Sequence, residues 1–548
     1  MHTPPFSKLL LASAIALALS ACGSSGDYVA PAEPVIPPPP VVEAGDSVML
    51  TASGRLASFN LDSPATLRTS LAVSGLQAGE VLLGIDFRPA DGNLYGVGNS
   101  GRIYTLNPTT GVATLKSTLV ADAADTTTPF AKLEGTEFGV DFNPAADRLR
   151  VVGSFGQSLR INVDTGATTT DGSINGGVAS TAINAAAYTN SFAGTANTTL
   201  FVIDAANSTL YTQSPPNNGT LASPVPLGVN ASVVGGFDID ARNNKGYAVM
   251  TVGGARNLYA INVGATSAAA TLVAALGVTE DVKGFALRAV KAPLVYGLTD
   301  SGRIIGFKPL TPSTLDTDVA ITGLASGEKL LGIDIRPKDG LMYAISSTGR
   351  IHTIDPVTGV ATFKVALAAD AADLTLPFSV VAGSEFAVDF NPVADRLRVI
   401  SNAGQSLRIN VDTGAATTDG AINRAGATPV VTAGAYTNSF AGTTATMLMV
   451  LDSQSDNLAL QNPPNEGTLT NIGALGVDLS GDSGMDIAGG ANGLVLAALR
   501  TAGAGPSRLY RIDLATGAAL PVNGAANAAL SVIGAGTVNV LDIAVSLK

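Results

Sequence analysis

The residues most capable of chemistry gather around one stretch, Glu137 to Gly166, which reads EFGVDFNPAADRLRVVGSFGQSLRINVDTG. Arginine's planar guanidinium binds carboxylates and phosphates through paired hydrogen bonds. Two carboxylates about 5–10 Å apart can cleave a glycosidic bond. The candidate polar cluster, which could bind a ligand or serve the structure, consists of Asp86, Arg88, Asp141, Asn143, Arg150, Gln157 and Arg160.

A structural interpretation of these residues is the one we favour. An Asp between apolar residues on a central strand is costly to bury unless it is paired or hydrogen-bonded. The Asp residues would then accept hydrogen bonds from neighbouring backbone N–H groups or from the arginines, and Asn143 would be a turn residue. In the ligand-binding interpretation, Asp86, Asp141, Arg150 and Arg160 surround a channel mouth and bind an anionic or polar ligand.

The stretch recurs as Glu385 to Gly414 without insertion or deletion, and Leu82–Pro89 recurs as Leu330–Pro337. A repeat of this length indicates a tandem duplication, so we expect two domains, at residues 47–290 and 291–548. The second copy of the polar cluster consists of Asp334, Arg336, Asp389, Asn391, Arg398, Gln405 and Arg408.

Short apolar runs separated by turn residues predict an all-β fold. Four such runs lie between Leu82 and Leu115, and an Asn/Asp-x-x-Thr-Gly turn recurs whose glycine we expect at positive φ. Four strands in about 40–50 residues, repeated, are typical of a β-propeller blade, with a tandem β-sandwich as the alternative. We therefore expect tandem β-propeller-like repeats, with about five four-stranded blades per copy. The expected inner strands begin near Leu82, Glu137, Ile183, Gly235 and Gly284, and near Leu330, Glu385, Val431, Gly484 and Val538.

The sequence leaves the closure of the blades open. The chain enters at Val48–Asn60, in the middle of a blade, and the missing inner strand appears at Val538–Val545. The two ends could therefore complete one blade between them and close a single ten-bladed ring. A blade from Gly284 to about Ile321 would then straddle the repeat boundary, which the short connection Val290–Leu294 favours. Two five-bladed rings are the other arrangement.

Residues 1–21 have the features of an export signal, with Lys8 followed by an apolar run. The tetrapeptide ending at Cys22 resembles the lipobox of bacterial lipoproteins, which implies cleavage before Cys22 and its acylation. Gly23 follows it instead of Asp, which by analogy favours the outer membrane, on its periplasmic or surface side. Residues 22–46 form a Pro-rich linker, which would hold the body roughly 60 Å from the membrane as extended polyproline.

Composition excludes several classes of function. An excess of 43 acidic over 31 basic residues argues against a nucleic-acid partner. A Ser-His-Asp site in each copy is excluded, because Tyr104 stands where the second copy has His352. A single cysteine rules out disulfides within the chain and thiolate metal sites. The acidic loop at residues 452–457 lacks the EF-hand pattern, so we predict neither a metal nor a cofactor.

The ordered motifs GIDFRP, VDFNPxxDRLRV, GQSLRxNxDTG, AYTN and QxPPNxGTL resemble a bacterial family catalogued as domain of unknown function 4394. This resemblance covers about residues 48–290 and 291–548 and implies an exported, propeller-like protein with no assigned activity. One departure is that Asp240 becomes Ala488 in the second copy, so Asp240 is not essential to what both copies share.

We therefore predict an exported, lipid-anchored binding or scaffold protein of the bacterial cell envelope, without catalytic activity. Its partners would be the membrane, through lipid on Cys22, and an unknown protein or small polar ligand. The alternative is a polysaccharide hydrolase or lyase that uses carboxylates and arginines at a propeller channel mouth. The absence of tryptophan and an aromatic content of only 5% count against a sugar-stacking platform.

Overall fold

The computed structural model describes residues 42–547 apart from 179, 289–292, 491–492 and 502–504. The predicted signal at residues 1–21, Cys22 and nearly all of the 22–46 linker lie outside the described residues. Within the described part, no helix is long and apolar enough to cross a membrane. Strands are the dominant regular elements of the described chain and its only helices are four short 3₁₀ helices, so the predicted all-β fold is confirmed.

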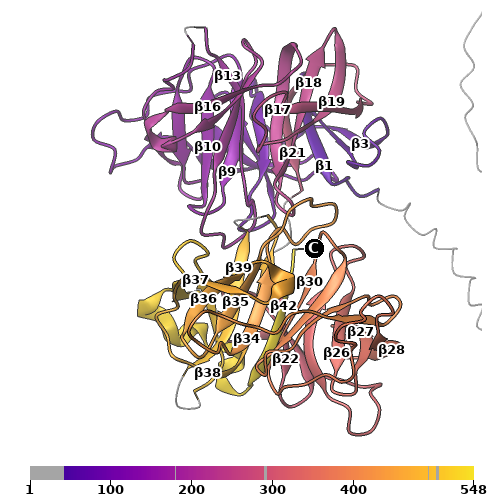
Figure 1. The fold of residues 1–548 in the computed structure, drawn as a ribbon. Helices are drawn as coiled ribbons and strands as arrows, with labels where there is room; N and C mark the ends of the chain where they lie inside the picture. The colour runs from indigo at the N-terminus through magenta and orange to yellow at the C-terminus, as the bar shows by residue number, and fades with distance from the viewer. Residues whose placement is uncertain (1–41, 179, 289–292, 491–492, 502–504, 548) are drawn as a thin grey trace, which may run out of the picture. The chain divides into compact units, whose positions relative to one another are not determined.

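The first ring, indigo to magenta in Figure 1, contains five blades. The first two blades are β21 (Val282–Leu287), β1 (Ser47–Thr51), β2 (Arg55–Phe59) and β3 (Leu67–Ala72), then β4 (Leu82–Phe87), β5 (Leu94–Gly98), β6 (Arg102–Leu106) and β7 (Ala113–Thr118). The third blade is β9 (Phe138–Asn143), β10 (Arg148–Gly153), β11 (Ser158–Ile161), β12 (Ala167–Thr170) and the short parallel strand β8 (Val120–Ala121). The last two are β13 (Ile183–Tyr188), β14 (Leu200–Asp204), β15 (Thr209–Gln213) and β16 (Leu221–Pro226), then β17 (Ala231–Asp240), β18 (Lys245–Val252), β19 (Ala255–Ile261) and β20 (Ala270–Ala275).

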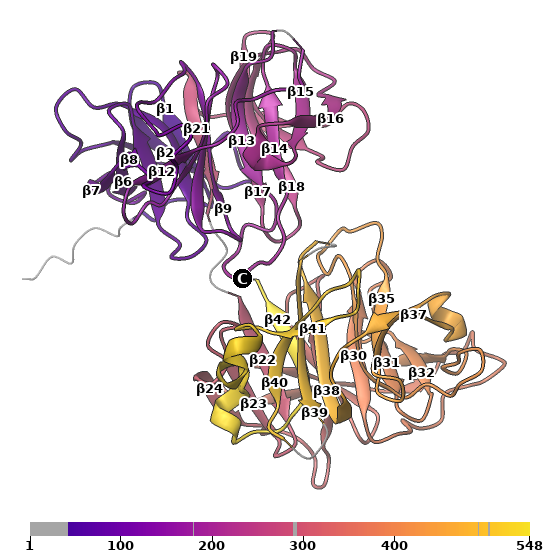
Figure 2. The same ribbon diagram turned by 90° about the vertical axis from the view of Figure 1, so that its left-hand side faces the viewer.

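The second ring repeats this plan and ends in yellow in Figure 2. Its first two blades are β42 (Val540–Ser546), β22 (Leu294–Thr299), β23 (Arg303–Phe307) and β24 (Leu315–Ala320), then β25 (Leu330–Ile335), β26 (Met342–Ser346), β27 (Arg350–Ile354) and β28 (Ala361–Ala366). The third is β30 (Phe386–Asn391), β31 (Arg396–Ser401), β32 (Ser406–Ile409), β33 (Ala415–Thr418) and β29 (Ala368–Ala369). The last two are β34 (Val431–Tyr436), β35 (Leu448–Asp452), β36 (Asn457–Gln461) and β37 (Leu469–Ala474), then β38 (Leu479–Ala488), β39 (Leu494–Thr501), β40 (Arg508–Ile512) and β41 (Ala519–Pro521). Short 3₁₀ helices are η1 (Pro216–Asn218), η2 (Pro464–Glu466), η3 (Ala525–Ser531) and η4 (Ile533–Gly536).

Each copy closes on itself, so the single ten-bladed ring is wrong. The entering strand β1 pairs with β21 of its own copy, with Val48 opposite Ala286. The C-terminal strand β42 pairs with β22, with Tyr296 opposite Ala544. The blade expected to straddle the repeat boundary does not form, because β21 and β22 pair with different partners. The inner strands β4, β9, β13, β17 and β21 pack in a circle, as do β25, β30, β34, β38 and β42.

The core of each ring lies between neighbouring blades. Inner strands are buried along nearly their whole length, whereas outer strands such as β3 alternate between half-buried and exposed residues. Aromatic side chains join adjacent blades edge to face, as Tyr95 does with Phe142 at 5.3 Å between ring centroids. Tyr343 and Phe390 repeat this contact in the second ring at 5.4 Å. Such edge-to-face pairs strengthen blade packing beyond the burial of their area.

The recurring Asn/Asp-x-x-Thr-Gly turns have the predicted backbone conformation. Gly166 and Gly414 each have a φ of 79°, in the left-handed region that side chains disfavour. A Cβ on Gly166 would also collide with the carbonyl group of Thr118. The turn therefore requires glycine for two reasons, the backbone angle and the close approach of the preceding blade.

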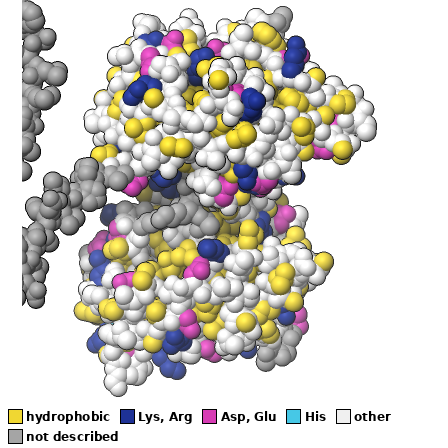
Figure 3. All heavy atoms as spheres, turned by 180° about the vertical axis from the view of Figure 1, so that it is seen from behind, with side chains coloured by type: hydrophobic (Ala, Val, Ile, Leu, Met, Phe, Trp, Pro, Cys, Tyr) yellow, Lys and Arg dark blue, Asp and Glu magenta, His cyan; other side chains and the backbone are white. Residues whose placement is uncertain are grey.

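On the face shown in Figure 3, acidic and basic groups lie interspersed among uncharged ones, with no broad patch of one sign.

Candidate functional site

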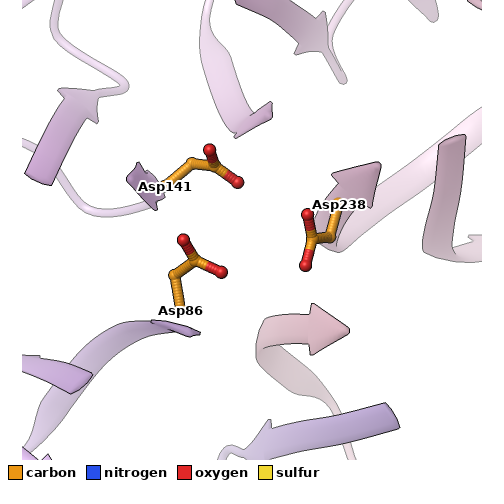
Figure 4. A group of neighbouring side chains, drawn as sticks. All are labelled: Asp86, Asp141 and Asp238. Atoms are coloured by element: carbon orange, nitrogen blue, oxygen red, sulfur yellow. The ribbon is translucent and has the colours of Figure 1, made fainter. Parts of the chain in front are cut away.

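Three buried carboxylates meet at the centre of the first ring. Asp86 lies on β4, Asp141 on β9 and Asp238 on β17, and one oxygen of each lies within 4.8 Å of those of the others. Figure 4 shows the three side chains converging from separate inner strands. Their residues are only 2–4% exposed. We call this group the axial triad of the first ring.

The axial carboxylates hydrogen-bond each inner strand to the next one. Asp86 accepts a hydrogen bond from the backbone N–H of Phe142 on β9 at 2.7 Å. Asp141 accepts one from Tyr188 on β13 at 3.0 Å, and Asp238 accepts one from Leu287 on β21 at 2.6 Å. These are the inter-blade bonds that the structural interpretation requires.

Burial raises the pKa of all three axial carboxylates. The pKa of Asp86 and that of Asp141 lie well above the ordinary value, first because of desolvation and then because of repulsion by neighbouring carboxylates. The pKa of Asp238 is raised to about 7, again mainly by desolvation, while hydrogen bonds from Leu287 and Ile239 oppose the shift. The triad therefore binds protons at a pH where free aspartate has lost them.

The second ring repeats the axial triad and adds a fourth acid. Asp334, Asp389 and Asp486 have one oxygen each within 4.8 Å of those of the others and are 2–3% exposed. Asp542 on β42 occupies the register position that Gly284 has on β21. Its carboxylate accepts a hydrogen bond from the N–H of Ile333 on β25 at 3.0 Å. The second ring thus gains an additional carboxylate link where its two ends meet.

Arg88 joins two blades at the end of β4. Its guanidinium contacts the carboxylates of Asp147 at 2.5 Å and Asp164 at 2.9 Å, both on the next blade. It also pairs with Asp91 on its own blade at 3.2 Å. Hydrogen bonds to Asp147, the largest contribution, raise the pKa of Arg88 above its usual range. Arg336 repeats these pairs in the second ring with Asp395, Asp412 and Asp339.

Arg150 is wholly enclosed beside the axial triad. Its Nη1 donates to Asp171 at 2.6 Å and to Ser158 at 3.0 Å, its Nε to the Tyr188 hydroxyl at 3.2 Å, and its Nη2 to Asn217 at 2.9 Å. Arg160 binds both oxygens of the same Asp171 carboxylate from the half-exposed side.

The second ring holds an equivalent network around one carboxylate. Arg398 and Arg408 both donate to Asp419, at 2.5 and 2.7 Å. The arginines therefore bind acids of their own ring.

The amide residues of the cluster brace turns and loops. Asn143 accepts hydrogen bonds from the N–H groups that follow it in the β9–β10 turn, and Asn391 does the same after β30. Gln157 accepts one from Glu134 N–H and donates to the Lys132 carbonyl. Gln405 makes the same pair of bonds in the second ring.

The model of the family described as "Domain of unknown function (DUF4394)" matches residues 55–286 and again residues 303–534. The chain belongs to the DUF4394 family. Both matches run in the same phase, so each DUF4394 copy corresponds to one ring together with its axial triad and arginine networks.

Other comparisons add little to the DUF4394 assignment. No curated protein matches the chain. A chain of a solved "Nidogen/Laminin Complex" is 12% identical with a TM-score of 0.30, covering 45% of this chain and 98% of its own. A solved protein from Lactobacillus plantarum is 16% identical with a TM-score of 0.26, covering 64% of this chain and 95% of its own.

The structure separates residues that the ligand-binding interpretation had grouped. Asp86 and Asp141 lie in the axial triad, whereas the guanidinium groups of Arg150 and Arg160 bind Asp171. Sequence reasoning missed Asp238 and its repeat Asp486, although both DUF4394 copies retain them. Sequence reasoning also did not assign partners to the arginines. Four of the partner acids lie within the repeated stretch and two lie just beyond it: Asp147, Asp164, Asp395 and Asp412, then Asp171 and Asp419.

Among the described residues, the axial triads have the spacing that a metal ion would need. Hard cations prefer such oxygen ligands, but both oxygens of Asp86 and both oxygens of Asp238 already accept backbone hydrogen bonds. The acidic loop at residues 452–457 does not fit a calcium site. Asp452 pairs with Arg424 at 2.5 Å and accepts the N–H of Val430 at 2.9 Å. A guanidinium on this carboxylate competes with any cation.

Proposed function

We propose that the protein is an exported, lipid-anchored binding or scaffold module of the bacterial envelope, without catalytic chemistry of its own. The proposal rests on how the polar cluster is used. Each guanidinium nitrogen of Arg150 already has a partner, and the carboxylate of Asp171 is shared by two arginines. A group bonded in this way has little capacity left for a substrate, and both copies repeat the arrangement.

The anchoring part of the proposal rests on the leader. The segment that ends at Cys22 resembles a lipobox, and this cysteine is the single one in the chain. A lone acyl chain binds membranes reversibly, so a stable anchor needs at least two chains on the cysteine. The Pro-rich linker that follows would serve as a stalk.

A polysaccharide hydrolase or lyase is the second candidate function. The observation that favours it is the pKa of Asp238, raised to about 7, because a general acid works best near the ambient pH. The burial of the triad counts against it, since residues 2–4% exposed offer a polymer no access. The proposal therefore assigns the raised pKa to structure.

A substrate screen tests the absence of catalysis. The mature, delipidated protein is incubated with polysaccharide, ester and phosphate substrates, and we expect turnover no faster than in buffer. Turnover that disappears in the double variant Asp141→Asn, Asp389→Asn would make the protein an enzyme and overturn the proposal. The variant must be shown to be folded under the assay conditions for this conclusion.

Cell fractionation tests the anchor. We expect Cys22→Ala to move the protein from the membrane fraction to the soluble fraction, because the variant has no acylation site. Ser24→Ala, two residues away, serves as the control and should remain in the membrane fraction. Unchanged membrane partition of Cys22→Ala would contradict the lipoprotein assignment.

A further inference from the structure

The second ring has an open groove at one end of the core between its β22–β24 blade and its β25–β28 blade. The cavity measures about 710 Å³. Tyr296, Ile335, Met342 and Ile354 form its apolar floor, with threonine hydroxyls along the side. Pockets for small organic ligands typically measure about 300–1,000 Å³ and combine an apolar wall with a few polar groups. The groove has this character.

The first ring fills the corresponding place with its own residues. Arg288, directly after β21, occupies the position that Ser546 has in β42 of the second ring. The guanidinium of Arg288 lies 5.9 Å from the ring centroid of Phe87. The same guanidinium donates to the carbonyl of Ala44 at 3.3 Å, which brings the segment before β1 over the core. Phe87 is consequently 2% exposed. The second ring has a serine at this position and leaves the apolar surface open.

The groove carries negative charge. Asp355 lies on its rim, and no lysine or arginine is among the described residues that line it. Burial, and then the charge of Asp355, raise the pKa of Tyr296, so the carboxylate and the phenol act on one another. Oδ1 of Asp355 accepts the N–H groups of Val357 and Thr358. The carboxylate also accepts a hydrogen bond from the side chain of Thr358 and is exposed to solvent on the rim.

We propose that this groove binds a small organic cation, an ammonium or guanidinium group on an apolar stem. The cation would lie over the face of Tyr296 and pair with Asp355, while the stem covers Ile335 and Leu341. Arg288 over Phe87 is the intramolecular form of the same contact in the first ring. The inference deepens the proposed function, on which it rests, because it gives the binding module a ligand class.

A series of matched small molecules tests the charge preference. Benzylammonium, benzyl alcohol and phenylacetate share an aromatic stem and differ in charge. Calorimetric titration of the mature full chain should show that benzylammonium binds at least about tenfold more tightly than benzyl alcohol, and that phenylacetate does not bind. Equal affinities for the three, or no binding of benzylammonium up to about 10 mM, would overturn the inference.

Two variants localise the site. Asp355→Asn copies Asn107 of the first ring, which caps the same turn through the N–H groups of Thr109 and Thr110, so the fold is retained. It should weaken benzylammonium at least about tenfold and leave benzyl alcohol unchanged. Ser546→Arg copies Arg288 and should abolish binding of both.

The control is Asp478→Asn, an exposed acid of the same ring outside the groove. It removes one charge and should bind all three molecules as wild type does. Equal effects of Asp355→Asn and Asp478→Asn would refute the site. Failure of these titrations removes the ligand assignment alone, whereas turnover in the substrate screen would remove the proposed function.

Discussion

We expect the stability of the rings to fall as the pH rises from about 4 to about 7. A carboxyl group whose pKa is higher in the folded state than in the unfolded state contributes most to stability below its unfolded pKa, where it is protonated in both states. This stabilisation is lost as the pH rises through the folded pKa. For Asp238, a folded pKa of about 7 against about 3.9 unfolded corresponds to about 4 kcal/mol. Asp486, with a pKa of about 6, contributes about 3 kcal/mol in the second ring.

Other carboxylates act in the opposite direction at low pH. Hydrogen bonds and ion pairs lower the pKa of Glu328 and that of Asp412 to about 2. These groups stabilise the fold above their unfolded pKa, and this contribution is lost as the pH falls through about 2. The two effects together place the greatest stability near pH 4, on the order of three units below neutrality.

Asp141→Asn isolates the contribution of one axial carboxyl group. Oδ1 of Asp141 accepts the N–H of Tyr188, and its Oδ2 has no hydrogen-bond partner among the described residues, so asparagine can replace the protonated acid. Between pH 5 and 7, the free energy of unfolding of wild type should decline more steeply than that of the variant, with an upper limit of about 1.4 kcal/mol per pH unit for one proton. Asp389→Asn tests the second ring.

Urea unfolding followed by circular dichroism at several pH values measures this difference. Asp478→Asn, the exposed control, should reproduce the wild-type slope. Parallel pH profiles for wild type and Asp141→Asn would refute the reasoning, as would a wild-type stability that is constant or rises between pH 5 and 7.

Three further perturbations address the polar cluster and the buried acid Glu328. Asp141→Ala should lower the free energy of unfolding by about 1–3 kcal/mol, because Tyr188 N–H loses its acceptor; urea unfolding identical to wild type would contradict this. Arg150→Met breaks a buried ion pair with Asp171 and should lower the free energy of unfolding by about 3–5 kcal/mol. Arg160 binds the same carboxylate but is 34% exposed, so Arg160→Met should lower it by about 1 kcal/mol or less. Equal losses of stability would argue against burial as the cause. Glu328→Gln should flatten the loss of stability between pH 4.5 and 2, and coincident acid-unfolding curves would exclude that contribution.

The blades were predictable because their signals are local. Inner strands were expected near Leu82 and Ile183, and β4 and β13 begin at these residues. The closure of the rings was not predictable, because β1 and β22 are equivalents and β21 could pair with either one. The hydrogen-bonding edges of the two strands are alike, so only completion of a five-bladed circle selects between them.

The axial triads were partly predictable. An Asp within an apolar strand drew attention to Asp86 and Asp141, since such a residue needs a hydrogen-bond donor. Asp238 was not predicted as part of the cluster, because the clearest difference between the copies at this strand is Asp240, which the second copy replaces with Ala488. The acid that pairs with Arg150 was also out of reach, because the pairing of Asp171 with a residue two strands away depends on how the blade packs.

The two copies help to distinguish structural groups from groups that serve a ligand. Arg88 and Arg150 recur with the same partners, as expected if every ring needs them to hold its blades together. A ligand site, by contrast, can be present in one copy alone. In that copy, a residue that the other copy uses to cover its core can be replaced without loss of the fold. Arg288 covers an apolar floor in the first ring, and its replacement by Ser546 leaves the equivalent floor open in the second. For a binding module built from two similar rings, such a difference between the copies is therefore where specificity can arise without loss of the fold.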